Sequence, residues 1–110
     1  MLAKKFRLPI QDWFSERKKA ITRKSSFFIV KIADSDLAYG RFGVVVSSKV
    51  SKSAVNRNKI KRTIFDFIRL GKLREISGKI GKDVLIIVLP KTAKLEKKEI
   101  EKELGEIIDY

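Results

Sequence analysis

The sequence predicts an α+β fold in which a small sheet of about four strands packs against three helices. Along the chain the predicted order is helix, two or three strands, helix, strand and helix, which is typical of a sheet covered by helices. The chain has 110 residues, of which 44% are hydrophobic. This length and composition fit a single domain spanning residues 1–110 with one hydrophobic core.

The chain opens with a basic, extended segment that leads into a first helix over about Ile10–Lys19. Ile10, Trp13 and Phe14 occupy positions i, i+3 and i+4, so they form one apolar side of that helix. A short edge strand is expected next, over Ile21–Lys24.

Three further segments have the composition of β-strands. Phe27–Ile32 and Phe42–Ser47 are rich in β-branched and aromatic residues, and the short link between them predicts that they run antiparallel to each other. Asp83–Leu89 is an almost continuous apolar run that ends at Pro90. Such a run predicts a central strand buried on both faces.

Two more helices are predicted in the second half of the chain. The longer one spans Ala54–Leu70, with Ser51 or Ser53 as its N-terminal cap. Its buried stripe follows the i, i+4, i+7, i+8 rule and consists of Ile60, Ile64, Phe67 and Ile68. The last helix spans about Leu95–Ile108, and its apolar side consists of Leu95, Ile100, Leu104, Ile107 and Ile108. Leu73–Ile80 is ambiguous between a helical turn and a loop.

Positive charge is concentrated in two parts of the chain. Lys and Arg number 26 against 13 Asp and Glu, which gives a net charge of +13. Residues 1–24 carry a net +6 and residues 41–82 a net +10, whereas residues 83–110 carry a net −2. Solubility does not require this asymmetry, so the pattern indicates a polyanionic partner with a phosphate backbone.

Missing residue types exclude several kinds of site. The chain has neither cysteine nor histidine, which excludes disulfides, most zinc sites, and Ser-His or Cys-His catalysis. Its longest apolar run, Val84–Leu89, is too short to span a bilayer. The basic N-terminus also lacks an apolar signal core. We therefore expect a cytoplasmic protein with no membrane partner.

The start of the long helix carries the most informative motif, Ala54-Val55-Asn56-Arg57-Asn58-Lys59-Ile60-Lys61-Arg62. Arg57 and Lys61 are four residues apart, as are Asn58 and Arg62, so each pair lies on one side of the helix. Arginine forks and asparagine amides fit phosphates and RNA edges. A solvated helix face is the simpler interpretation, but the net +10 around the motif favours RNA contact.

In the order of its motifs the chain resembles the protein subunit of bacterial ribonuclease P. Phe6-Arg7-Leu8 precedes the first helix, and Arg41–Ser47 gives an Arg-Phe-Gly strand. Ser48–Arg62 gives a lysine-bearing loop and the family's Arg-Asn-Arg type of helix, with Lys59 where arginine is usual. Asp83–Pro90 matches an aspartate-led strand that closes at proline. The resemblance covers nearly the whole chain.

This resemblance implies a ribosomal protein S5 domain 2-like fold with a left-handed strand–helix–strand crossover, against a right-handed preference of about 98%. It also implies a protein that is monomeric by itself and binds two partners, ribonuclease P RNA and the 5′ leader of precursor tRNA. The RNA, with Mg²⁺ ions that it holds itself, would cleave the precursor. No catalytic or metal-ligating residue is therefore predicted in this chain.

Two sets of site residues follow from the basic motif and the resemblance. The expected RNA contacts are Lys49, Lys52, Arg57, Asn58, Lys59, Lys61, Arg62 and Arg69. The expected leader cleft consists of Trp13, Phe14, Arg17, Phe28, Val30 and Lys31. Aromatic faces stack on any base, and one of the two first-helix aromatics is expected in the cleft while the other packs in the core. Strand alternation leaves open whether Phe28 and Val30, or Phe27 and Ile29, meet the helices. Phe65, on the polar side of the long helix, is predicted to pack.

Other functional classes stay open. A ribosomal or RNA-chaperone-type protein would bind RNA without affecting precursor cleavage. A DNA-binding module is less consistent, because the cations span a broad helix face and a loop rather than a short reading surface. A nuclease acting alone is disfavoured, because Asp66 and Glu75 are the only carboxylates of residues 41–82 and do not form a pair for two-metal chemistry.

Overall fold

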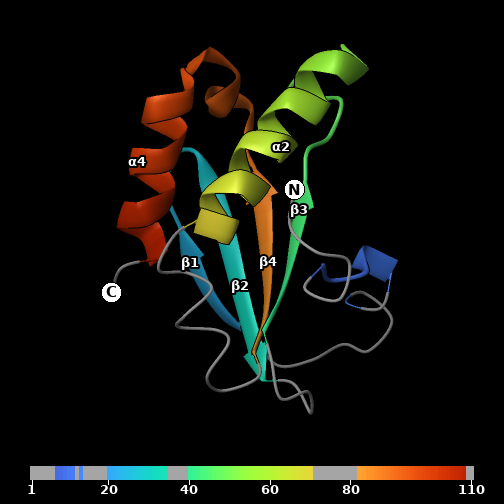
Figure 1. The fold of residues 1–110 in the computed structure, drawn as a ribbon, viewed down its shortest axis with the longest axis vertical. Coiled ribbons are helices and arrows are strands. Elements are labelled where there is room, and N and C mark those ends of the chain that lie inside the picture. Colours follow the sequence, from blue (N-terminus) through green and yellow to red (C-terminus); the bar gives the residue numbers. More distant parts are fainter. Residues whose placement is uncertain (1–6, 12, 14–19, 35–39, 71–81, 109–110) are drawn as a thin grey trace.

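A four-stranded sheet forms the middle of the molecule (Figure 1). The computed structural model describes residues 7–11, 13, 20–34, 40–70 and 82–108. The strands are β1 (Ile21–Lys24), β2 (Phe28–Asp34), β3 (Arg41–Val45) and β4 (Lys82–Val88), in the order β1-β2-β4-β3. β2 pairs antiparallel with β1 and with β4, whereas β3 pairs parallel with β4.

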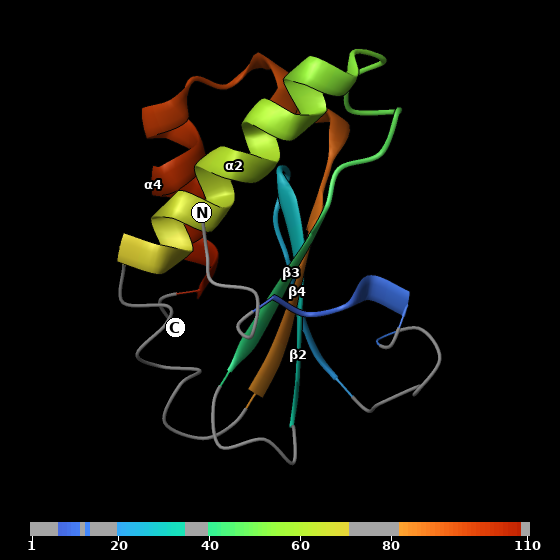
Figure 2. The same cartoon turned by 45° about the vertical axis from the view of Figure 1, so that its right-hand side comes forward.

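Two helices cover one face of this sheet, which confirms the predicted α+β class. α2 spans Ala54–Leu70 and α4 spans Lys97–Ile108, and both lie on the same side of the strands in Figures 1 and 2. A 3-10 helix, η2 (Pro90–Lys94), joins β4 to α4. The last helix begins two residues later than predicted, because Leu95 is extended with φ −86° and ψ 145°.

Capping and burial explain why α2 forms where the sequence predicts it. The Asn56 N–H donates to Ser53 Oγ at 3.3 Å, so Ser53 is the N-terminal cap. Ile64 and Ile68 are fully buried against the sheet. Phe65 is only 3% exposed, which confirms the prediction that it packs.

The main core lies between the helices and the sheet and uses alternate residues of each strand. β2 contributes Phe28 and Val30, and the register sets them opposite Val88 and Ile86 of β4. The apolar side predicted for the last helix is confirmed for its described buried members, which are Ile100, Leu104 and Ile107. This packing fixes which face of β2 is turned away from the helices.

β3 runs antiparallel to β2, as predicted, but β4 lies between these two strands in the sheet. Ile86 of β4 pairs with Val30 of β2 on one side and with Val44 of β3 on the other. The reason is the composition of β4, since four consecutive residues from Asp83 to Ile86 are buried. A strand that is apolar on both faces buries the most apolar surface when it lies in the middle of a sheet, which is the central position that the apolar run predicted. The shorter β3 takes the edge.

β3, α2 and β4 form a crossover between two parallel neighbours. Both strands run upward in Figure 1, α2 lies in front of the sheet, and β4 lies to the left of β3. A right-handed connection would place the second strand on the right in this view, so the crossover is left-handed. The handedness agrees with the fold that the resemblance implies, against a preference of about 98% for the right-handed form.

Residues 7–11 and 13 form the N-terminal segment, which pairs with the edge strand β3 and continues onto the sheet face away from α2 and α4 (Figure 2). The Leu8 N–H donates to Phe42 O at 2.7 Å, and Arg7 forms a parallel bridge with Phe42. Gly43 permits this close approach. A Cβ atom at that position would lie 2.8 Å from Ile10 Cδ1 and 3.3 Å from Leu8 Cβ and Leu8 O.

A second, smaller core forms where this segment meets the sheet. Trp13 is 8% exposed and packs in one cluster with Leu8, Ala33 and Leu85. Within the first predicted helix, residues 10, 11 and 13 are helical, and the rest lies outside the described residues. The ambiguous Leu73–Ile80 segment also lies outside them.

Candidate nucleic-acid interface

The outward side of α2 is basic. Its first turn contains no acidic residue. The exposed members of the predicted RNA-binding set on this helix are Asn58, Lys59, Lys61, Arg62 and Arg69. The structure thus places them on the surface, as predicted, and their contact with RNA stays a prediction. Asp66 is the acidic residue on this helix, and its Oδ1 lies 4.0 Å from Arg69 Nε.

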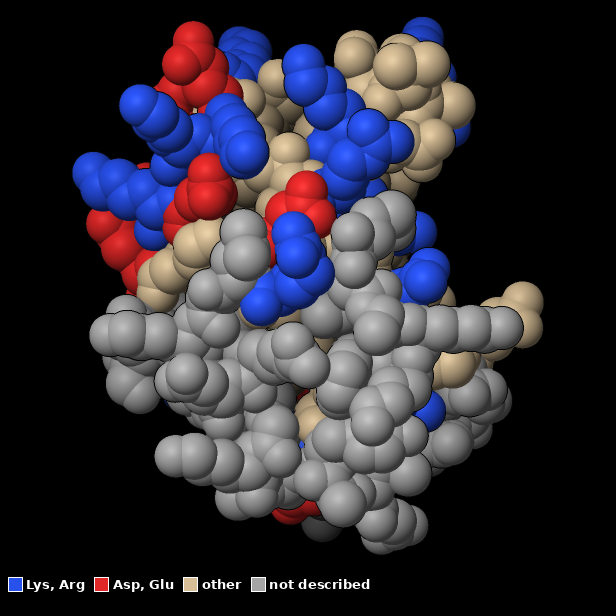
Figure 3. Space-filling model, in the orientation of Figure 1, with Lys and Arg blue, Asp and Glu red and all other residues tan. Residues whose placement is uncertain are grey.

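The charge distribution distinguishes α2 from α4. Figure 3 shows Lys and Arg gathered over α2, whereas both signs of charge are mixed over α4. The sequence of α4, with four glutamates and three lysines, explains this mixture. A phosphate backbone is therefore attracted to α2 and its surroundings more strongly than to α4.

The loop before α2 adds two exposed lysines, Lys49 and Lys52, to this surface. Arg57 differs from the other cations of α2 because it is half-buried, and its Nη1 donates to Ser51 O at 2.8 Å. Lys61 and Arg62 line a different pocket from Lys59, which lies beside the residues that lead into α4.

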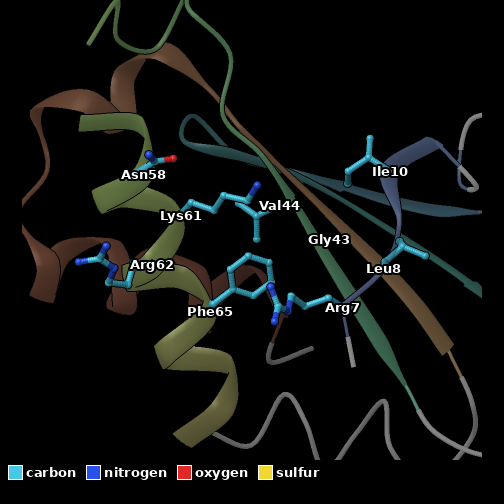
Figure 4. Close-up of a pocket in the computed structure, with 9 residues that line it drawn as sticks. All are labelled: Arg7, Leu8, Ile10, Gly43, Val44, Asn58, Lys61, Arg62 and Phe65. Carbon is cyan, nitrogen blue, oxygen red and sulfur yellow. The ribbon is translucent and has the colours of Figure 1, made fainter. Parts of the chain in front are cut away.

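A pocket of about 300 Å³ lies between α2, β3 and the N-terminal segment (Figure 4). Asn58, Lys61 and Arg62 line it from α2, and Arg7 lines it from the N-terminal segment. Figure 4 shows the Arg7 and Lys61 side chains extending into the space between these two elements. The remaining lining is mostly apolar and consists of Leu8, Ile10, Gly43, Val44 and Phe65. Three cations around a small pocket suit an anionic group such as an RNA phosphate.

Arg7 is a functional candidate that the sequence analysis did not include among the RNA contacts. It lies 50 or more positions before the helix cations, so periodicity could not associate them. The feature of the sequence that could have pointed to Arg7 is its neighbour Leu8. An arginine next to a buried apolar residue is held at a fixed position on the surface.

The predicted leader-cleft residues divide into four groups. Phe28 and Val30 are fully buried beneath the helices, so the prediction that they line a cleft is wrong. Trp13 is the first-helix aromatic that packs in a core. Phe14 and Arg17 lie outside the described residues. Lys31 is half-exposed on the sheet face that carries the N-terminal segment.

That second sheet face has a partly exposed apolar row beyond the N-terminal segment. Ile29, Ile87 and Val45 stand side by side in the register of three strands, and all three are half-buried. Lys31 is the next residue of β2 on this face. Lys31 is the feature of the sequence that could have identified this face. Successive residues of a strand point to opposite faces, so a charged residue marks the face that is not in the core.

Arg41 and Asp83 form a bidentate ion pair where β3 and β4 begin. Arg41 Nε lies 3.0 Å from Asp83 Oδ1, and Nη2 lies 2.9 Å from Oδ2. Asp83 is 1% exposed and the Arg41 side chain is 16% exposed. The pair locks the register of the two parallel strands and so supports the floor of the pocket, which includes Gly43 and Val44.

The described parts of the chain contain neither a cluster of metal ligands nor a membrane-spanning helix. In those ranges no three His, Cys, Asp or Glu side chains gather closely enough to hold a metal ion. Among the same residues, no helix is both long and apolar enough to cross a membrane.

Comparison with known proteins gives the family. Residues 2–110 match the family model described as ribonuclease P. The chain belongs to the ribonuclease P protein family. The ribonuclease P protein component of Desulforapulum autotrophicum is 33% identical over 96 residues, which cover 87% of this chain and 79% of that protein. The ribonuclease P protein component of Mycoplasma mycoides is 38% identical over 87 residues, which cover 79% and 77% of the two chains.

Solved structures of ribonuclease P proteins have the same fold. The Staphylococcus aureus RNase P protein superimposes with a TM-score of 0.77 at 22% identity and covers 94% of this chain and 93% of its own. The Thermotoga maritima RNase P protein, solved in complex with 1-(4-fluorophenyl)-2-thiourea, gives a TM-score of 0.75 at 24% identity and covers 93% and 96%. Membership of the ribonuclease P protein family confirms the resemblance stated from the motifs.

Proposed function

We propose that this chain is the protein subunit of a ribonuclease P holoenzyme that matures the 5′ end of tRNA. It binds ribonuclease P RNA through α2 and the adjoining loop. It also binds the 5′ leader of precursor tRNA through the sheet face opposite α2. The observation that carries this proposal is one pocket, in a protein of this family, that Arg7, Lys61 and Arg62 all line.

The pocket supports RNA binding because its cations come from two elements. A phosphate between Arg7 and Lys61 would contact the N-terminal segment and α2 at once, so binding would also hold these elements together. Each neutralised phosphate releases counterions from the RNA, which makes the affinity fall steeply with salt. Asn58 offers an amide for a ribose or base edge beside the phosphate.

The second sheet face supports leader binding because it combines apolar surface with a cation. The row Ile29, Ile87 and Val45 gives unstacked bases a surface to lie on, and Lys31 can contact the backbone of the same strand. These residues replace Phe28 and Val30 in the predicted cleft. Such contacts are sequence-tolerant, which suits leaders of varied sequence.

The cleavage chemistry itself is proposed to reside in the RNA. Mg²⁺ ions held mainly by that RNA would supply the metal chemistry. The carboxylate on α2, Asp66, lies next to Arg69, and Asp83 is bonded to Arg41. The part played by this chain is to screen phosphate repulsion between the two RNAs and to orient the precursor.

The test is multiple-turnover cleavage of a precursor tRNA by a bacterial ribonuclease P RNA at low magnesium. Wild-type protein is compared with Lys61→Ala/Arg62→Ala. The matched control is Lys98→Ala/Lys102→Ala, which removes the same charge from exposed positions of α4. We expect the wild type and the α4 variant to rescue cleavage at the mature 5′ end, and the α2 variant to need more protein for the same rate.

Two results would contradict the proposal. A protein that binds the RNA but leaves the cleavage rate unchanged would instead indicate a ribosomal or RNA-chaperone-type role. Equal losses from the α2 and α4 variants would show that total charge, and not the position of the cations, governs the effect.

A further inference from the structure

Arg57 is placed differently from the other cations of the candidate interface. Lys59, Lys61 and Arg62 are exposed, whereas Arg57 is half-buried. Its Nη1 reaches back from the first turn of α2 and donates to Ser51 O at 2.8 Å. One donor of its guanidinium is therefore committed to the backbone of the loop that precedes the helix.

That loop is held on both sides of this contact. Val50 is 6% exposed and belongs to the main core, and its N–H donates to Ser47 O at 3.1 Å. Ser53 caps α2, and its own N–H donates to Ser51 Oγ at 3.2 Å. Ser51 lies between these two points, so the Arg57 bond completes the attachment of the loop to the helix.

The loop lysines lie directly beside the attachment points. Lys49 precedes Val50, and Lys52 lies between Ser51 and Ser53, and both side chains are exposed. A cation on a loop that is fixed in place loses less conformational entropy on binding than a cation on a loop that moves. The planar arginine fork suits this role, because one N–H can bond a carbonyl while the others stay available.

We propose that Arg57 is a positioning residue that fixes the Ser47–Ser53 loop, so that Lys49 and Lys52 contact RNA phosphates together with the cations of α2. This inference rests on the proposed function, because it assigns the RNA contact of the loop to that interface. Arg57 acts mainly through the two lysines, whereas Arg62 acts through its own contact.

The first test is a double-mutant cycle on the affinity for ribonuclease P RNA as a function of salt. Lys49→Ala/Lys52→Ala is combined with Arg57→Ala, and separately with the control Arg62→Ala. Two lost phosphate contacts should reduce the salt slope by about 1.5 to 2. We expect this reduction in the wild-type and Arg62→Ala backgrounds, and less than half of it in the Arg57→Ala background.

The second test uses the protein without RNA. Because the chain has no cysteine, Lys52→Cys and Lys98→Cys each give one site for a nitroxide spin label, on the loop and on α4. We expect Arg57→Ala to increase the mobility of the loop label only, and Arg62→Ala to change neither label. Increased mobility at both sites would mean a general loosening of the fold and would overturn the proposed role.

The outcomes separate this inference from the proposed function. Additive losses in the cycle, or an unchanged loop label in Arg57→Ala, would contradict the positioning role while the protein still binds the RNA. A wild-type protein that fails to bind the RNA would contradict the proposed function and, with it, the RNA contact assigned to the loop.

Discussion

Gly43 is the position where the fold and the candidate interface are most tightly coupled. In Gly43→Ala the new Cβ would lie 2.8 Å from Ile10 Cδ1, a flexible side-chain end that can move. It would also lie 3.3 Å from Leu8 O, which belongs to backbone held by the 2.7 Å bond from Leu8 N to Phe42 O. The N-terminal segment must therefore shift by a few tenths of an ångström or lose that bond.

The expected cost follows from this geometry. Overpacking typically destabilises by about 1–3 kcal/mol, and replacing glycine by alanine in a strand returns about 0.5–1 kcal/mol. A net loss of about 1–2 kcal/mol corresponds to a fall in melting temperature of about 4–8 °C for a domain of this size. Because Arg7 moves with the segment, the affinity for ribonuclease P RNA should fall as well.

Thermal unfolding followed by circular dichroism measures this loss, with Gly105→Ala as the matched control. Gly105 lies inside α4, and a Cβ there would be an ordinary 3.7 Å from Phe67 Cζ. That change should raise the free energy of unfolding by about 0.5–1 kcal/mol. The reasoning is refuted if Gly43→Ala unfolds at or above the wild-type temperature, or if Gly105→Ala is the less stable of the two variants.

Three further predictions follow from single contacts. Asp83→Ala leaves the Arg41 guanidinium in a mostly buried site without its carboxylate, and should lower the free energy of unfolding in urea by about 3 kcal/mol; a loss below 1 kcal/mol would contradict a structural role for the pair. Thr92→Val removes a 2.7 Å bond from a fully buried hydroxyl to Phe27 O and should cost about 1 kcal/mol in the same assay; equal stability would contradict it. Lys31→Ala should raise KM about fivefold for a precursor with a long leader and leave KM unchanged for a one-nucleotide leader; equal effects on both would remove Lys31 from the leader contact.

The sequence predicts elements well where packing is local. The Ser53 cap, the buried run of β4, and Ile64 and Ile68 of the predicted α2 stripe follow from periodicity and composition, and the structure agrees with them. Ile60 and Phe67 of that stripe are only partly buried. The order of the strands does not follow in this way. The short link between β2 and β3 predicted their antiparallel directions correctly, but it did not show that β4, which is buried on both faces, lies between them.

The candidate interface could be predicted only within one element. The cations of α2 share a helix, so their spacing was enough to place them together on the surface. Arg7 joins them only through the tertiary packing of Leu8 against β3. Alternation in β2 defined two faces but did not say which one meets the helices, and that choice separates the buried Val30 from the half-exposed Lys31.

The most direct measurement of how this protein faces its RNA uses a tethered cleavage reagent. With no cysteine in the chain, an iron–EDTA group can be attached at Asn58→Cys on α2 or at Lys98→Cys on α4, both of which are exposed positions. Each labelled protein is bound to ribonuclease P RNA, and strand scission is mapped. Scission from the α2 site with only background from the α4 site is the predicted result. Equal scission from both sites, or scission from α4 alone, would contradict an RNA interface on α2.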